Sequence, residues 1–355
     1  MIKIALVMIV KNEETVLERC LKSAASMVDE IIIVDTGSTD QTKQIAEKWK
    51  AQVYDFEWTQ DFSLARNFGL QQSTADWNLI LDADEYIHEA DWEKVKSLLT
   101  VQSPAEFVGR ITIVNETIVN GEFSKATNRI PRLLPAGVRF QGKIHEQISE
   151  QWRRVDLPIT VHHDGYLNQN KSARNIPILE QELKAHPESP YYCYQLAKEF
   201  EGTSDYAQAK HYYEKAYKLL SGKERYAPNV VVAYLYVLIK LGQLEEAWDI
   251  IQPQHSWLQN FPDYHFVCGI FYLDWIMLSP EQRIKDLPLI EKSYLRCLEI
   301  GETAVYDSVE GTGSYAALYN LGNYYEVLGM KGKAVECFQK AANLGYEKAK
   351  TRLNS

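Results

Sequence analysis

Apolar and polar positions along the start of the chain alternate between two patterns. Four runs are rich in apolar residues and have the length of strands: residues 2–10, 31–34, 51–56 and 77–81. Residues 13–25 carry apolar side chains at helical spacing, and a second helix ends near Trp49, with Ser38 or Thr39 as its expected N-cap. Strands in alternation with helices predict a parallel sheet with right-handed crossovers, which is an α/β fold.

The pattern continues with a helix at residues 61–72 and a strand at residues 107–114, after which Asn120-Gly121 favours the turn of a hairpin. Residues 125–154 are locally basic in an acidic chain. Such a run could hold an anionic ligand near the edge of the sheet, or it could be a solvated face.

From residue 171 onward the strand pattern ends, and Tyr, Ala, Leu and Lys dominate helical stretches that Pro and Gly separate. Small and aromatic positions recur at the same offsets in residues 196–216 and 321–341, and a weaker copy covers residues 242–251. These segments resemble tetratricopeptide repeats, whose stacked helix pairs form a concave surface suited to an extended peptide or another subunit. The alternative is a helical cap that only buries a face of the first domain.

Length and composition limit the interpretation further. A chain of 355 residues exceeds what one core usually serves, so we predict two domains, residues 1–168 and residues 169–355. The net charge of -10 argues against a general nucleic-acid binder, which needs a basic face. Five cysteines without a Cys-x-x-Cys pair fit a reducing compartment. Because no apolar run reaches the roughly 20 residues of a membrane span, we expect a soluble, cytoplasmic protein with no transmembrane segment.

Three carboxylates, those of Asp82, Asp84 and Glu85, follow the apolar run at residues 77–81. The carboxyl edge of the strands is where open α/β sheets bind ligands. If strand geometry persists, Asp82 and Asp84 point the same way, so that one can approach a hard cation while the other reaches a hydroxyl. The same acids could also form a solvated loop, because acidic residues are common in loops.

Four motifs follow one another in the first half of the chain: residues 8–14 (MIVKNEE), 34–40 (VDTGSTD), 61–67 (DFSLARN) and 81–85 (LDADE). Their order and spacing resemble family 2 glycosyltransferases of the GT-A fold, a Rossmann-like α/β domain with a mostly parallel sheet. The resemblance covers roughly the first 165 residues and implies an inverting transferase. Its donor would be a nucleotide-diphosphate sugar, usually a UDP-sugar, used with Mn²⁺ or Mg²⁺.

The resemblance also implies roles for individual positions. Asp84 would bind the metal, and His163, late in the domain, would complete the metal shell. Asp35-Thr36 departs from the Asp-Asp of many members, so which carboxylate contacts the uracil stays open. The residues expected to hold the nucleotide sugar are Val10, Asn12, Glu13, Asp35, Ser38, Arg66, Asn67 and Asp82.

Two further groups have their own chemistry. The planar guanidinium of Arg66 suits a pyrophosphate, with an ion pair to Asp61 as the alternative. An inverting transferase needs a base on the face opposite the leaving nucleotide, and His145 or Glu146 could supply it. Glu146 is preferred, because a carboxylate is ionised at neutral pH and resembles the acidic base of the family.

The combination of the two halves points to an enzyme with a macromolecular substrate. It resembles sublancin-type peptide S-glycosyltransferases and other bacterial protein glycosyltransferases, and it also resembles lipopolysaccharide-core transferases of the heptose glucosyltransferase type. We therefore expect a peptide or protein acceptor held by the helical repeats, with a glycan acceptor as the alternative. A homodimer through the repeats is a further option, and a non-catalytic scaffold that binds nucleotide sugars is the alternative of another class.

Overall fold

The computed structural model describes residues 2–101, 107–119, 122–149, 151–163, 171–253, 256–303, 305 and 307–353, with the main chain alone at residues 101, 116–119 and 122–126. The chain divides into two compact units, Met1–Glu182 and Leu183–Ser355. The boundary predicted between residues 168 and 169 lies outside the described residues.

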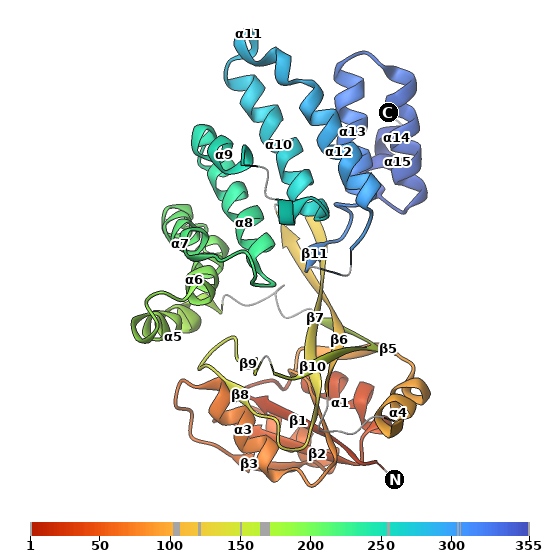
Figure 1. The fold of residues 1–355 in the computed structure, drawn as a ribbon. Coiled ribbons are helices and arrows are strands. Elements are labelled where there is room, and N and C mark those ends of the chain that lie inside the picture. Colours follow the sequence, from red (N-terminus) through yellow and green to blue (C-terminus); the bar gives the residue numbers. More distant parts are fainter. Residues whose placement is uncertain are drawn as a thin grey trace. The chain divides into compact units, whose positions relative to one another are not determined.

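The first unit is built on a twisted mixed sheet with the strand order β3-β2-β1-β4-β7-β6-β10-β5 (Figure 1). These strands span Ile4–Val10 (β1), Glu30–Asp35 (β2), Gln52–Asp55 (β3), Trp77–Ile80 (β4), Glu85–Ala90 (β5), Phe107–Val119 (β6), Glu122–Pro135 (β7) and Arg153–His163 (β10). A separate small hairpin pairs β8 (Phe140–Gln141) with β9 (Gln147–Ile148).

The sheet has a parallel half and a mixed half. Strand β1 pairs in parallel with β2 and β4, and β2 pairs in parallel with β3, as the alternation of strands and helices predicted. Beyond β4 the pairs β4–β7, β6–β7 and β10–β5 are antiparallel, whereas β10–β6 is parallel. Val119 of β6 lies opposite Glu122 of β7, which confirms the predicted hairpin, and its turn at Asn120-Gly121 lies outside the described residues.

Alternate residues of the central strands face opposite layers of the first unit. Ile4, Leu6 and Met8 of β1 pack in one cluster with buried residues of α1 (Leu17–Ala24), α2 (Thr42–Lys48) and α4 (Trp92–Val101). Ala5 and Val7 belong to a second cluster that includes Leu70 of α3 (Phe62–Gln72). Because both faces of β1 are buried, its sequence is a continuous apolar run.

Helix starts in this unit follow local hydrogen bonds. Asp61 caps α3, because its Oδ1 atom accepts from the Leu64 N–H at 2.9 Å. The N-cap predicted for α2 at Ser38 or Thr39 is wrong, since α2 begins at Thr42. There the carboxylate of Asp40 accepts from the Thr42 N–H at 3.0 Å.

The second unit is helical apart from the short strand β11 (Ser308–Val309). After α5 (Ser172–Ala185), which crosses the boundary between the units, the helices are α6 (Pro190–Gly202), α7 (Tyr206–Leu219), α8 (Ala227–Lys240), α9 (Leu244–Ile251), α10 (Pro262–Leu278), α11 (Pro280–Arg283), α12 (Pro288–Ile300), α13 (Tyr315–Val327), α14 (Lys331–Asn343) and α15 (Glu347–Leu353). Helix pairs therefore occur where the repeats were predicted, at α6–α7, α8–α9 and α13–α14.

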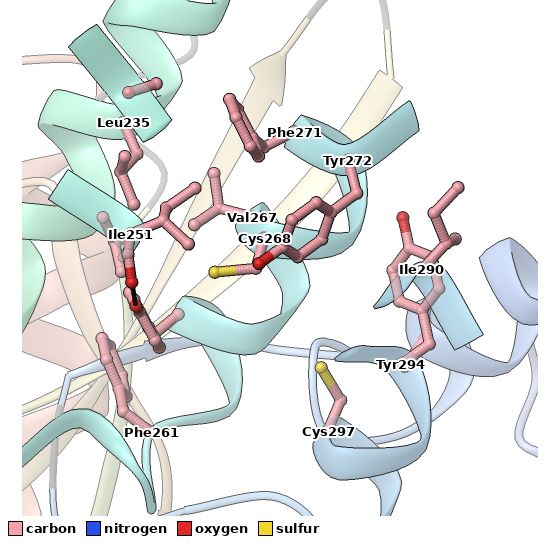
Figure 2. Packing of buried hydrophobic residues seen from close by; sticks show 14 of the residues in the cluster. Leu235, Ile251, Phe261, Val267, Cys268, Phe271, Tyr272, Ile290, Tyr294 and Cys297 are labelled. Carbon is pink, nitrogen blue, oxygen red and sulfur yellow. Dashed lines mark hydrogen bonds between the residues drawn. The ribbon is translucent and has the colours of Figure 1, made fainter. Parts of the chain in front are cut away.

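Small residues let aromatic rings of the partner helix approach closely. A Cβ atom added at Gly322 of α13 would lie 2.5 Å from the ring of Phe338 on α14. The same holds at Gly269 of α10, where the ring of Tyr294 on α12 would be 2.6 Å away. Figure 2 shows the core that includes Tyr294, with Cys268, Tyr272 and other apolar side chains of the same cluster.

The cysteines behave as small buried hydrophobes. All five are free and buried, and burial raises the pKa of Cys268 to about 12. Within the described residues, no helix combines the length and apolar character that crossing a membrane requires.

Candidate active site

The loops after β1 and β2 are tied together at the carboxyl edge of the sheet. Asn12 has a φ of 56°, a left-handed conformation that asparagine tolerates better than most residues. Its N–H donates to Ser38 Oγ at 2.9 Å, and its Oδ1 atom accepts from the Thr39 N–H at 2.8 Å. Two residues predicted to hold the nucleotide sugar, Asn12 and Ser38, therefore meet here and shape the loops through their mutual hydrogen bonds.

Asp35 ends β2 and is fully buried. Its Oδ1 atom accepts from the N–H groups of Gly37 at 3.0 Å and Ser38 at 2.8 Å. Gly37 has a φ of 103°, which glycine adopts more readily than other residues, so glycine permits this tight turn. Its Oδ2 atom is buried and has no hydrogen-bond partner among the described residues. A buried acceptor of this kind calls for a donor group from a ligand or a water.

The position after Asp35 holds a hydroxyl residue, Thr36, and not a second carboxylate. Thr36 is buried and donates to the Val10 carbonyl oxygen twice, through its N–H at 3.0 Å and its Oγ1 at 3.1 Å. The carbonyl of Val10 is thereby occupied by the protein itself. In this loop Asp35 is therefore the acidic group placed to receive a donor.

The two aspartates of the Asp-Ala-Asp motif point to different partners. Strand β4 ends at Ile80, so Asp82 and Asp84 lie in the turn before β5 rather than on a strand. The expectation that they point the same way, which depended on strand geometry, is wrong. Asp82 faces two arginines, whereas Asp84 faces His163 and Lys171.

Asp82 is clamped between guanidinium groups from two elements. Arg66 of α3 donates from Nη2 to Oδ1 at 2.7 Å, and Arg132 of β7 donates from Nη2 to Oδ2 at 3.0 Å. The same Nη2 atom of Arg132 also binds Glu85 Oε1 at 2.8 Å. Burial would raise the pKa of Asp82, but the charges and hydrogen bonds of the two arginines hold it far below its usual range.

Asp84 and His163 form a pair that is suited to a cation. The Nε2 atom of His163 lies 3.3 Å from Asp84 Oδ2, and its Nδ1 atom lies 2.9 Å from Oδ1 of Asn115. A hydrogen bond from Nδ1–H to Asn115 leaves Nε2 for a metal, which is how ligating histidines are commonly oriented. Burial would lower the pKa of His163, but the hydrogen bond and the charge of Asp84 raise it above its ordinary value.

A lysine also reaches this pair. Lys171 Nζ lies 3.0 Å from Asp84 Oδ2. Burial would raise the pKa of Asp84, but His163 and Lys171 lower it below its usual value. Within the described residues, no group of three or more His, Cys, Asp or Glu side chains is arranged to hold a metal. Asp84 and His163 supply one carboxylate and one imidazole, so a cation held here would need further ligands from a bound molecule or water.

The candidate base lies in the loop of the β8–β9 hairpin. Glu146 is largely buried, and Arg66 Nε donates to its Oε1 atom. His145 precedes it with a φ of 49°. The alternative considered for Arg66, an ion pair with Asp61, is wrong, because Arg66 binds Asp82 and Glu146 instead.

Asn67 supports this hairpin from α3. Its amide nitrogen donates to the Phe140 carbonyl at 3.0 Å, and its Oδ1 atom accepts from the Phe140 N–H at 2.8 Å. Both polar groups of Asn67 are thus bonded to the main chain of β8. In this structure Asn67 holds the segment that carries His145 and Glu146, although its motif suggested a contact with the nucleotide sugar.

Glu13 has an unusual protonation equilibrium. Burial raises its pKa to about 7, and the charges of Asp84, Asp82 and Asp40 act in the same direction, while Lys171 opposes them. This coupling shows that Glu13 shares the electrostatic environment of the Asp-Ala-Asp turn. The structure therefore brings Glu13, Asp35, Asp82, Asp84 and the hairpin residues to the same edge of one unit.

Sequence reasoning missed two residues of this site, Arg132 and Lys171, and it named Glu85 among the three carboxylates without giving it a role. Arg132 was counted only as part of a basic run, although it stands between apolar neighbours in Ile130-Pro131-Arg132-Leu133-Leu134. A lone arginine inside a strand-like apolar segment has to be paired when it is buried, and this signal could have identified it.

Family models agree with this architecture. Residues 5–162 match the model described as glycosyl transferase family 2. Residues 190–219 and 315–344 match the model of the tetratricopeptide repeat. The chain thus consists of a family 2 glycosyltransferase domain with a GT-A-like mixed sheet, followed by a helical tetratricopeptide-repeat domain.

Individual relatives share parts of this arrangement. The chain is 33% identical over 273 residues to a TPR repeat-containing protein of Synechococcus elongatus, across 71% of this chain and 66% of that protein. It is 28% identical over 243 residues to the SPbeta prophage-derived glycosyltransferase SunS of Bacillus subtilis, across 63% of this chain and 56% of that protein. The chain therefore spans 66% and 56% of the lengths of these two relatives.

One solved structure similar to the chain is the glucosyl-3-phosphoglycerate synthase from Mycobacterium tuberculosis in complex with Mn²⁺, uridine diphosphate and glucosyl-3-phosphoglycerate. The two share 22% sequence identity with a TM-score of 0.26, and the match covers 31% of this chain and 44% of the synthase chain.

Proposed function

We propose that the chain is an inverting, metal-dependent glycosyltransferase that moves a sugar from a UDP-sugar to a peptide or protein acceptor. The observation that carries the proposal is the meeting of Asp35, Asp82, Asp84, His163 and Glu146 at one edge of the sheet. This reaction requires three kinds of group: a buried hydrogen-bond acceptor for the nucleotide, a pair of side chains that binds a cation, and a carboxylate base.

The donor site begins at the loops after β1 and β2. The unpartnered Oδ2 atom of Asp35 suits the N–H of a uracil ring, and the open space at Gly37 leaves room for it. Asn12 and Ser38, joined by their hydrogen bond, would form the wall of this site together with Val10 at the end of β1. Asp82, held by its two arginines, would accept from the ribose or the sugar hydroxyls.

Asp84 and His163 would hold the divalent cation, Mn²⁺ or Mg²⁺, beside the diphosphate. When bound, such a cation stabilises the negative charge that develops on a diphosphate leaving group. Lys171, which binds Asp84 in this structure, would turn its ammonium group toward the same phosphate oxygens. Arg66 is bound to two carboxylates, so its role toward the donor is indirect.

Glu146 would act as the base. Its Oε1 atom is held by Arg66, and its Oε2 atom would take the proton from the acceptor nucleophile. The freed electron pair on the acceptor then forms a bond to the anomeric carbon, while the bond from that carbon to the nucleotide diphosphate breaks. The negative charge leaves with the nucleotide, and the configuration of the sugar inverts because the displacement is direct. His145 would position the acceptor or a phosphate.

The helical repeats support a macromolecular acceptor. Tetratricopeptide repeats commonly bind extended peptides on their concave face. SunS of Bacillus subtilis, which is a glycosyltransferase, resembles this chain across 63% of this chain and 56% of its own length. A peptide or protein is therefore our preferred acceptor, and a glycan is the outcome to be tested against it.

Donor hydrolysis and transfer can be measured on the full chain with a panel of UDP- and GDP-sugars, in Mn²⁺ and in EDTA. Glu146→Gln should abolish transfer to a hydroxyl acceptor, while UDP affinity measured by calorimetry stays within a few-fold of the wild type. The matched variant His145→Ala loses a positioning group but keeps the carboxylate base, so it should lower transfer without abolishing it. If His145→Ala is inactive and Glu146→Gln is active, the histidine is the base. If no sugar nucleotide binds at all, the chain is not a glycosyltransferase of this kind.

A further inference from the structure

Arg132 is placed in the site by an irregularity of the sheet. In the pairing of β6 with β7, Gly109 lies opposite Leu133 and Arg110 lies opposite Pro131, so Arg132 is the extra residue of a bulge. Bulges turn a side chain out of the regular alternation, and they are enriched next to active sites. The bulge gives Arg132 a direction that the regular ladder would not have given it.

Burial of Arg132 requires strong pairing. The residue is only 9% exposed, and an arginine in such a place destabilises the fold unless carboxylates surround it. Its Nη2 atom is shared between Asp82 Oδ2 at 3.0 Å and Glu85 Oε1 at 2.8 Å. Glu85 is itself 2% exposed, and its Oε2 atom accepts from the Asp82 N–H at 2.9 Å. Glu85 thus binds both the main chain of Asp82 and the arginine that holds its side chain.

The two oxygens of Asp82 are divided between two arginines with different further partners. Arg66 connects Oδ1 to Glu146, the candidate base. Arg132 connects Oδ2 to Glu85, which lies on β5 and has no place in the proposed transfer. Arg132 therefore binds Asp82, the carboxylate proposed to contact the donor, whereas Glu146, the candidate base, is bound by Arg66.

We propose that Arg132 is a positioning residue for the donor: it fixes the carboxylate of Asp82 in the orientation that binds the sugar nucleotide, with Glu85 as its anchor. This inference rests on the proposed function. It assigns to Arg132 an effect on donor affinity that is separate from the effect of Glu146 on transfer.

The test measures UDP affinity by calorimetry with Mn²⁺ on the full chain and compares Arg132→Met with the wild type. We expect the dissociation constant to rise about tenfold or more, in line with the loss of a group that orients a ligand-binding side chain. The matched control is Arg129→Met, on the same strand, where the arginine pairs with the more exposed Asp156 at 3.8 Å. This control should bind UDP as the wild type does.

A merely structural role predicts a different result. Loss of folded protein lowers the number of binding sites per chain and the apparent kcat, but it leaves the dissociation constant and the donor KM of the remaining sites unchanged. Wild-type UDP affinity in Arg132→Met would therefore overturn the inference.

If Arg132→Met does not fold, Arg132→Lys provides the test, because it keeps the positive charge between the carboxylates and removes the planar guanidinium group. UDP binding at least threefold weaker supports the inference, and unchanged binding refutes it. Failure of the wild type to bind UDP would instead refute the proposed donor.

Discussion

Removal of the Asp84 carboxylate is the sharpest test of the metal site. Asp84→Asn keeps the size of the side chain but replaces the charged carboxylate that would hold the cation with a neutral amide. A neutral amide oxygen binds a divalent cation much more weakly than a carboxylate does. Loss of one strong electrostatic stabiliser of a transition state typically lowers turnover by a factor of about 100 to 1,000, or roughly 3–4 kcal/mol. We expect at least a hundredfold loss.

Substitution of Lys171 should change the affinity for Mn²⁺ in the opposite direction. Its ammonium group lies 3.0 Å from Asp84 Oδ2 and has to yield that oxygen when a cation binds. The lysine side chain is 32% exposed, so its contribution is that of a partly solvated ion pair, about 0.5–1 kcal/mol. Lys171→Met should therefore tighten Mn²⁺ binding two- to fivefold in the absence of nucleotide.

The assay is Mn²⁺ binding followed by electron paramagnetic resonance, together with donor hydrolysis in Mn²⁺ and in EDTA. Circular dichroism and the melting temperature control for folding. Full activity of the wild type in EDTA would refute metal dependence altogether. Mn²⁺ affinity that is unchanged in Asp84→Asn would show that the cation, if it binds, is held elsewhere.

Two further predictions concern stability. Gly322→Ala should destabilise the repeat domain by roughly 1–3 kcal/mol in urea unfolding, because the new methyl group would lie 2.5 Å from the ring of Phe338, whereas Gly332→Ala, with open space around it, should stabilise by about 0.5–1 kcal/mol. Equal effects of the two substitutions would contradict this packing. The pKa of Glu13, raised to about 7, means that the metal-free folded protein holds this proton more tightly than the unfolded chain, so stability falls as pH rises from about 4.5 through 7. Glu13→Gln should raise the melting temperature more at pH 8 than at pH 5, and an equal gain at both pH values would count against the shift.

Local patterns in the sequence predicted the first strands and helices, the repeats and the family correctly. Strands β1, β2 and β4 are buried on both faces, and the continuous apolar runs that mark such strands can be read from neighbouring residues alone. The offsets of small and aromatic residues in α6–α7 and α13–α14 reflect contacts within one helix pair, so the repeats were visible as well. The motifs around Asp35 and the Asp-Ala-Asp turn indicated the family, since their order and spacing along the chain resemble those of the family.

The partners of the charged groups were decided only by the tertiary structure. Asp82 and Asp84 are two residues apart, yet one faces arginines from α3 and β7 and the other faces a histidine at the end of β10. Arg132 enters the site because of a bulge between β6 and β7, which is a property of strand pairing and leaves no periodic signal. A sequence can indicate that a charged residue is buried and needs a partner, because its neighbours in the chain are apolar. Which partner it finds depends on strand order and register, and these are set by contacts between distant parts of the chain.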